Sequence, residues 1–122
     1  MQKVTLTELD EGDSLQFPWG AIKWLCNDQI DPAAEMTLGV VYLKVGEHNP
    51  LHYHPNCEEL LYVLSGECDH CLGDDVYSMK AGMMIRIPKR AKHSAINKGW
   101  QPVTMLVCYS SGDRQTVFCD DE

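Results

Sequence analysis

The chain has 122 residues, with 18 Asp and Glu against 10 Lys and Arg and a net charge of −8 at pH 7. This length can bury one hydrophobic core but not two, so we expect a single domain over residues 1–122. The acidic balance argues against nucleic acid as a partner, because nucleic acid requires a basic surface. No apolar run approaches the roughly 20 residues of a membrane helix. The acidic start has no apolar signal-peptide core, which favours a cytoplasmic location and no membrane contact.

An acidic leader over residues 1–18, with Glu8, Asp10, Glu11 and Asp13, precedes the first expected strand. Short apolar segments then follow one another, and Gly, Pro and Asp residues interrupt them, which predicts an all-β sandwich or barrel. We expect strands over 19–25, 36–45, the segment around His52, 60–64, 67–72, 76–79, 84–87, 93–97 and 103–109. A polar, acidic tail over 110–122 closes the chain. The six cysteines are scattered, so we expect free thiols, although Cys68-x-x-Cys71 leaves a zinc clip or redox pair open.

Residues 46–66 contain a candidate set of metal ligands. His52 and His54 are two residues apart, so on a strand both point to the same face. Glu59 opens the next apolar run and comes close to both imidazoles if that run pairs back on the His strand. Glu58 is the rival carboxylate, which points the opposite way unless the register slips by one residue. The alternative interpretation is a pair of surface histidines on an edge strand.

Residues 82–97 add a third imidazole. Pro88 closes a strand, residues 89–92 form a polar turn, and His93 begins a strand that places His93, Ala95 and Asn97 on one face. Taken alone, a histidine here is more often an ordinary hydrogen-bonded residue than a ligand.

The two segments resemble the two signature motifs of the cupin superfamily. The first motif reads Gly, five residues, His-x-His, three or four residues, Glu, six residues, Gly, and every interval is matched by Gly46, His52, His54, Glu59 and Gly66. The resemblance implies a double-stranded antiparallel β-barrel of the jelly-roll kind, with the motifs in a core over 46–97 and a metal inside one end.

The second motif reads Gly, five residues, Pro-x-Gly, two residues, His, three residues, Asn. It is matched by Gly82, Pro88, His93 and Asn97, with Arg90 in the place of the second Gly. Glycine tolerates positive φ and arginine does not do so freely, so we expect a turn of different shape. The resemblance makes His93 a ligand beside His52, His54 and Glu59.

Three imidazoles and one carboxylate form a mixed nitrogen and oxygen set for one divalent transition metal. This set suits Fe, Mn, Ni, Co, Cu or Zn. The resemblance favours octahedral Fe or Mn with two positions open to water, oxygen or substrate.

Half of the fixed positive charge lies in residues 86–98, in and around the turn that leads to His93. It predicts a positive rim, with Arg90 and Lys92, that attracts a small anionic substrate. Arg114 in the tail adds a bidentate contact to a carboxylate if the tail folds over the site. The alternative interpretation is a solvated turn that keeps the protein soluble.

The leading functional hypothesis is a metal-dependent, oxygen-using oxidation of a small organic anion, as in a dioxygenase. The alternatives are non-redox lyase, isomerase or decarboxylase chemistry, or a non-catalytic cupin that binds a small molecule. The sequence identifies no general acid or base.

The face of the Glu59 strand opposite the ligand carries Leu60, Tyr62 and Leu64, all apolar. A sheet face in water should be polar, so something must cover it. A homodimer is the leading interpretation. The alternative is a cover from the same chain by residues near Phe17, Trp19 and Trp24.

Overall fold

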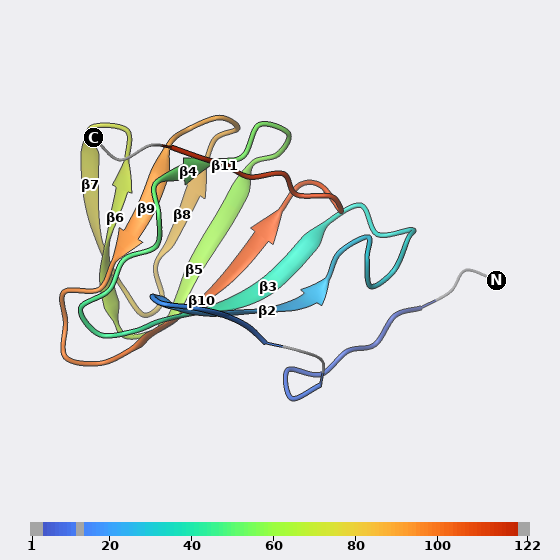
Figure 1. Cartoon of the computed structure of the whole chain (residues 1–122), viewed down its shortest axis with the longest axis horizontal. Helices are drawn as coiled ribbons and strands as arrows, with labels where there is room; N and C mark the ends of the chain where they lie inside the picture. Colours follow the sequence, from blue (N-terminus) through green and yellow to red (C-terminus); the bar gives the residue numbers. More distant parts are fainter. Residues whose placement is uncertain (1–3, 12–13, 120–122) are drawn as a thin grey trace.

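The computed structural model describes residues 4–11 and 14–119, and within these it consists of two facing antiparallel β-sheets (Figure 1). The expected all-β, double-stranded antiparallel barrel is confirmed. Among the described residues, no helix is long and apolar enough to cross a lipid bilayer. The acidic residues expected at Asp13 and at Asp120 to Glu122 lie outside the described part of the chain.

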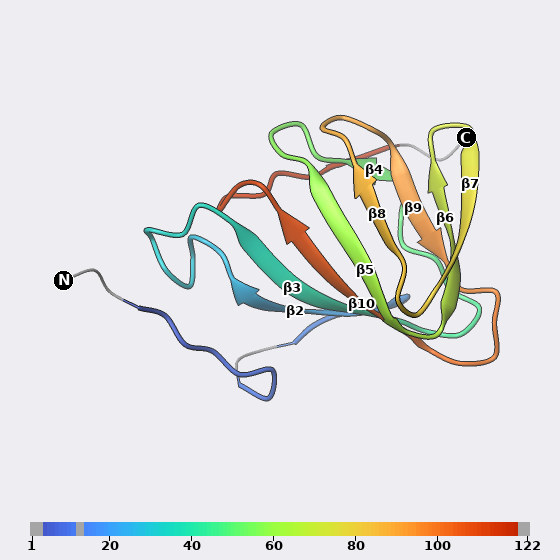
Figure 2. The ribbon, with the colours of Figure 1, turned by 180° about the vertical axis from the view of Figure 1, so that it is seen from behind.

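The larger sheet has six strands in the order β1-β2-β3-β10-β5-β8. Seen from behind in Figure 2, β5 lies between β8 and β10. The bounds of these strands are β1 Leu15–Phe17, β2 Gly20–Cys26, β3 Thr37–Leu43, β5 Glu59–Ser65, β8 Met84–Ile87 and β10 Val103–Tyr109.

The smaller sheet has five strands in the order β11-β4-β9-β6-β7. Their bounds are β4 His52–Tyr53, β6 Glu67–Leu72, β7 Asp75–Lys80, β9 His93–Ile96 and β11 Val117–Phe118. The sequence did not predict β1 or β11, since two or three residues are too few to show an alternating pattern.

Alternation along the central strands builds the core. Every second residue of β3, of β10 and of β5 as far as Val63 points between the sheets and is buried. Full burial of such a side chain contributes about 1.5–3 kcal/mol. The buried apolar residues from these three strands are Val41, Leu43, Leu61, Val63, Val103, Met105, Val107 and Tyr109.

The expected pairing of β5 with the His strand is wrong. β4 pairs with β9 and β11, whereas β5 pairs with β10 and β8 in the other sheet. Residues 54–58 therefore cross from one sheet to the other instead of closing a hairpin. Pro55 and Asn56 lie in this crossing, where no ladder hydrogen bonds are needed.

The outer face of β5 stays apolar and exposed. Leu60, Tyr62 and Leu64 are 42%, 40% and 46% exposed. The alternative, a cover by residues near Phe17, Trp19 and Trp24, is not observed within the described residues, because Trp19 and Trp24 pack against the core cluster between the sheets.

Positive backbone φ values coincide with the glycines of both motifs. Gly46, Gly66 and Gly82 have φ of +79°, +86° and +94°. Among the described residues, Arg90 is the only non-glycine residue with positive φ, at +72°. The turn therefore keeps a left-handed residue at this position, and the expected loss of that conformation is not observed. The Arg90 N–H donates to the carbonyl of His54 at 2.9 Å, which holds the turn against the chain that follows β4.

We expect Arg90→Gly to raise the free energy of unfolding by up to about 1 kcal/mol. A left-handed L-residue costs roughly 1–2 kcal/mol, and the larger unfolded-state entropy of glycine offsets part of the gain. Urea denaturation measures the change. Lys92→Gly is the matched control, because Lys92 is exposed on the same turn without positive φ, and it should lower the stability. Equal destabilisation by both variants would contradict strain at Arg90.

Candidate metal centre

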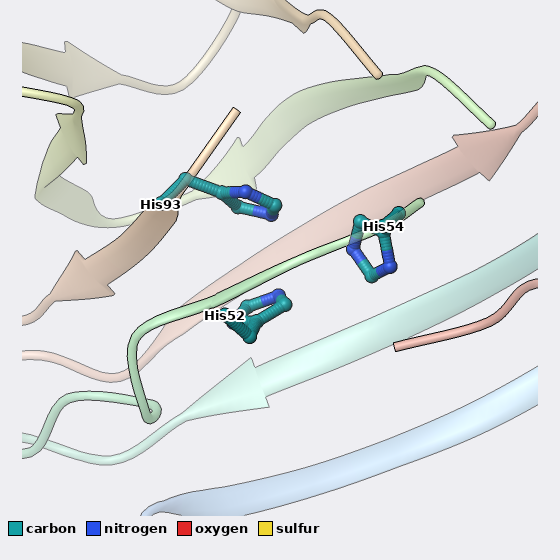
Figure 3. A group of neighbouring side chains, drawn as sticks. All are labelled: His52, His54 and His93. Atoms are coloured by element: carbon teal, nitrogen blue, oxygen red, sulfur yellow. The ribbon is translucent and has the colours of Figure 1, made fainter. Parts of the chain in front are cut away.

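Three imidazoles converge between the sheets (Figure 3). The ring nitrogens that His52, His54 and His93 offer as ligands all lie within 4.8 Å of one another. His52 on β4 pairs directly with His93 on β9, and His54 follows two residues later on the same face. His54 and His93 are each 2% exposed and His52 is partly buried, so two of the three rings are shielded from water. The clustering expected from the two motifs is therefore present.

Backbone carbonyls set the tautomer of each ring. The Nδ1 atoms of His52, His54 and His93 lie 2.7, 2.9 and 2.9 Å from the carbonyl oxygens of Pro50, Gln115 and Ala91. A carbonyl can only accept, so each Nδ1 carries a proton and donates it. A neutral ring then has its lone pair on Nε2, the form in which an imidazole binds a metal ion.

Glu59 reaches this cluster from the opposite sheet. Its Oε1 atom lies 3.1 Å from Nε2 of His93 and 3.3 Å from Nε2 of His54, and the residue is 3% exposed. Glu58 points outward and pairs with Arg86 at 2.6 Å on the exposed face. The alternation of side chains therefore predicted correctly that Glu59 faces the histidines. The expected pairing of its strand with the His strand was nevertheless wrong.

These contacts bring together groups that need a cation between them. Burial acts to raise the pKa of Glu59, but the hydrogen bonds and charges of His54 and His93 outweigh it and lower the pKa to about 2. Burial and the neighbouring His93 lower the pKa of His52 to about 4. With Nδ1 of His54 and His93 donating to backbone carbonyls, the Nε2 atoms face the Glu59 carboxylate, and a shared proton or a metal ion must lie between these acceptors. The donor set fits a divalent ion, since it offers three nitrogens and one oxygen.

A cavity of about 260 Å³ is lined by three members of this cluster, His52, His93 and Glu59, and not by His54. Arg114 lines it, with its guanidinium 4.7 Å from the Trp24 ring and 5.1 Å from the Tyr109 ring, and its Nη1–H donates to Thr116 Oγ1. Arg90 and Lys92 are exposed and do not line the cavity. Of the three basic residues considered from the sequence, the structure brings only Arg114 to the site. That Arg90 and Lys92 attract an anionic substrate as long-range charges stays a prediction.

Tyr109 was not singled out from the sequence, and it lies beside both Arg114 and the cluster. Its ring is 5.0 Å from that of His54. Burial, followed by the charge of Glu59, raises its pKa well above the usual value, and a hydrogen bond with Glu59 acts in the same direction. The phenol therefore keeps its proton at neutral pH and donates to the carboxylate.

His70 is a second residue that sequence reasoning missed. It lines the same cavity from β6, is 1% exposed, and its ring stacks on that of His93 at 5.7 Å and 22°. Burial and the neighbouring His93 lower its pKa to about 4, so the ring is neutral at pH 7. Alternation along its strand could have predicted that His70 points inward, because it shares a face with Cys68 and Leu72.

The cysteines take no part in this centre. All six are free, as expected. Cys68 is buried and Cys71 only partly so, and burial raises the pKa of Cys68 to about 11. In residues 4–11 and 14–119, the three histidines form the one group of side chains that could hold a metal, so the zinc clip is not supported. Cys57 is buried near Glu59, and burial raises its pKa.

Comparison with known proteins finds one matching family model and several similar proteins. The family model described as "Cupin domain" matches residues 39–109. Protein SchB of Streptomyces halstedii is 31% identical over 98 residues, which cover 80% of this chain and 71% of SchB. The uncharacterized protein MJ1618 of Methanocaldococcus jannaschii is 30% identical over 120 residues, with 94% and 96% covered.

Solved structures of oxalate decarboxylases have the same fold. The S161A mutant of the enzyme from Bacillus subtilis superposes with a TM-score of 0.82 at 20% identity over 90% of this chain. The formate complex of the Lactobacillus farciminis enzyme gives 0.80 at 21% identity over 87%. The matched region makes up 30% and 33% of those chains, so this chain spans about a third of their length.

We expect one divalent metal per chain in protein purified without added metal. His54→Ala should remove most of it, since Nε2 is one of the converging donors, and Glu59→Gln should weaken retention at least about tenfold. His48→Ala and Glu58→Gln are the matched controls, because both side chains lie outside the cluster. Elemental analysis measures metal content, and verified chelation should lower the melting temperature. Equal metal loss from the Glu58 and Glu59 variants would contradict the role of Glu59.

Proposed function

This chain belongs to the cupin family, and we propose that it is a metal-dependent lyase that removes a carboxyl group from a small organic acid. One observation carries the proposal. Arg114 lines one cavity together with His52 and His93 of the three-histidine group and with Glu59, which contacts that group, and the other walls of the cavity are largely apolar. The proposal also draws on the oxalate decarboxylases, whose fold this chain shares.

Arg114 supplies the contact for the acid. Its guanidinium has five N–H donors, and the structure uses one of them on Thr116. Within the described residues, no carboxylate lies within 4.0 Å of Arg114. The rings of Trp24 and Tyr109 hold the guanidinium in place by cation–π contact. A preorganised, unpaired guanidinium of this kind binds a carboxylate with two parallel hydrogen bonds.

The apolar walls favour an acid with a hydrocarbon body over one as polar as oxalate. The cavity of about 260 Å³ is smaller than the roughly 300–1,000 Å³ of typical ligand pockets, so the substrate must be small. Aliphatic and aromatic side chains form most of its lining, which suits the apolar body of such an acid. These side chains are Phe17, Trp19, Ile22, Val41, Pro50, Leu61, Met105, Val107, Tyr109 and Phe118.

The metal site fits this chemistry. His52, His54, His93 and Glu59 would hold the ion, which would act as a Lewis acid on an oxygen of the bound acid. Mn or Fe is favoured, and Ni, Co, Cu or Zn also suits the donor set. Mn(II) centres are named for the Bacillus subtilis oxalate decarboxylase, which supports Mn here.

The reaction breaks the bond between the carboxyl carbon and its neighbour. The electron pair stays on the neighbouring carbon, which takes up one proton, and carbon dioxide leaves. Tyr109 keeps a proton inside the cavity, beside Glu59. No oxidant is consumed, which separates this proposal from the dioxygenase-like oxidation that the sequence favoured.

We expect Mn-loaded protein to release carbon dioxide from at least one member of a panel of small aliphatic and aromatic acids without net oxygen uptake. Arg114→Gln should lower kcat/KM about ten- to hundredfold with unchanged metal content, because a hydrogen bond to a charged group contributes about 1.5–3 kcal/mol. Arg86→Gln is the matched control on the outer sheet face. Lys92→Ala should matter only at low salt.

Three results would count against the lyase proposal. Stoichiometric oxygen uptake would favour oxidation. Binding of acids without turnover would favour a non-catalytic cupin. Equal kinetic effects of the Arg114 and Arg86 variants would remove the arginine from the binding site.

We also infer that two copies of the chain associate through the outer face of the six-stranded sheet. The apolar patch there consists of Tyr42, Leu60, Tyr62, Leu64 and Met84, each at least 40% exposed. An outer sheet face in water is normally polar, so a second copy is the simplest cover. Tyr62→Lys should convert a dimer into a monomer in sedimentation experiments, whereas Tyr77→Lys on β7 should not. A monomeric wild-type protein would contradict the inference.

A further inference from the structure

His70 is a buried polar side chain with no protein partner. It is 1% exposed, and among the described residues neither Nδ1 nor Nε2 has a hydrogen-bond partner. Its neighbours on the inner face of β6 are Cys68 and Leu72, which offer no strong donor or acceptor. Buried polar atoms are nearly always hydrogen-bonded, so an unpaired imidazole that lines a cavity points to a ligand.

His70 and Arg114 lie on opposite sides of the histidine cluster. In the five-stranded sheet, β4 and β9 with His52 and His93 lie between β11 and β6 (Figure 1). Arg114 leads into β11, and His70 lies on β6. Both side chains line the same cavity, so a bound molecule meets a guanidinium on one side and an imidazole on the other.

His70 does not belong to the ligand set itself. The nitrogens within 4.8 Å of one another come from His52, His54 and His93, and His70 is not part of that group. Its ring stacks nearly parallel to that of His93, at 5.7 Å between centroids. His70 therefore lies beside a proposed metal ligand, where its ring can contact a molecule bound next to the metal centre.

We propose that the acid bound in this cavity carries a hydroxyl or carbonyl oxygen in addition to its carboxylate, and that His70 hydrogen-bonds this second oxygen. The proposal rests on the function proposed above. The ring nitrogens of an imidazole can donate and accept hydrogen bonds, which matches a hydroxyl or a carbonyl oxygen. A site built to hydrogen-bond an oxygen strongly rejects an analogue that lacks it, because its own polar atoms are then left unpaired.

Matched pairs of acids that differ by one oxygen function test this assignment. The pairs are benzoate with para-hydroxybenzoate, and pentanoate with levulinate. Calorimetric titration of Zn-loaded protein should show at least about tenfold tighter binding of the oxygenated member of one pair. His70→Phe keeps a ring against His93 and removes both nitrogens. It should abolish the preference, change the affinity for the plain acid less than about threefold, and leave the zinc content unchanged. His48→Phe, outside the cavity, should change nothing.

A second measurement needs no variant. Nitrogen NMR of histidine-labelled, Zn-loaded wild-type protein should show the His70 ring resonances moving with the oxygenated acid and not with its plain partner. Static His70 resonances, a preference that survives in His70→Phe, or equal weakening of both acids would overturn the assignment. Plain acids that bind through Arg114 with no preference in the wild type would leave the proposed function standing and remove only the role of His70. Failure of every acid to bind would overturn both.

Discussion

Three hydrogen bonds to backbone carbonyls underlie the chemistry of this site. The acceptors are the carbonyls of Pro50, Ala91 and Gln115, and each takes the Nδ1 proton of one histidine. These bonds turn the Nε2 lone pairs toward one point, where Glu59 brings negative charge. Without them, either nitrogen of each ring could carry the proton and the cluster would have no defined donor set.

The accepting carbonyls belong to loops, so the precision of the site depends on how these loops are held. The N–H of Arg90 donates to the His54 carbonyl, which joins the turn after β8 to the chain after β4. The N–H of Gln115 donates to Oδ1 of Asn56 at 3.0 Å. Asn97, the last residue of the second motif, binds the carbonyls of Leu43 and Gln101 and accepts from Gly99. Its role is to secure the turn between β9 and β10 rather than to touch the centre.

Alternation within strands explains why much of the site could be predicted. Which of Glu58 and Glu59 faces inward depends only on the parity of one strand, so the choice was right although the assumed partner strand was wrong. The ligand spacing likewise needed no knowledge of the sheet order. Arg90 shows the limit of a sequence motif, because arginine replaces the glycine of the motif while the backbone keeps a positive φ at this position.

The rest of the site depends on contacts between distant strands. His70 reaches the cavity because β6 pairs with β9, and Tyr109 because β10 pairs with β5. No pattern within a single strand predicts the order of the strands in the two sheets. The packing of Arg114 between Trp24 and Tyr109 joins three segments that are far apart in the chain. β1 and β11 were missed for the opposite reason, since both are too short to leave a pattern.

The ligand set draws on both layers of the sandwich, with three histidines from one side and Glu59 from the other. An ion held there would act as a cross-link between the two layers. The layers could not separate without breaking a coordination bond, so the binding free energy would add to the cooperative unfolding of the whole sandwich rather than to that of one hairpin. Metal binding and the packing of the two sheets against each other would then be coupled in one cooperative transition.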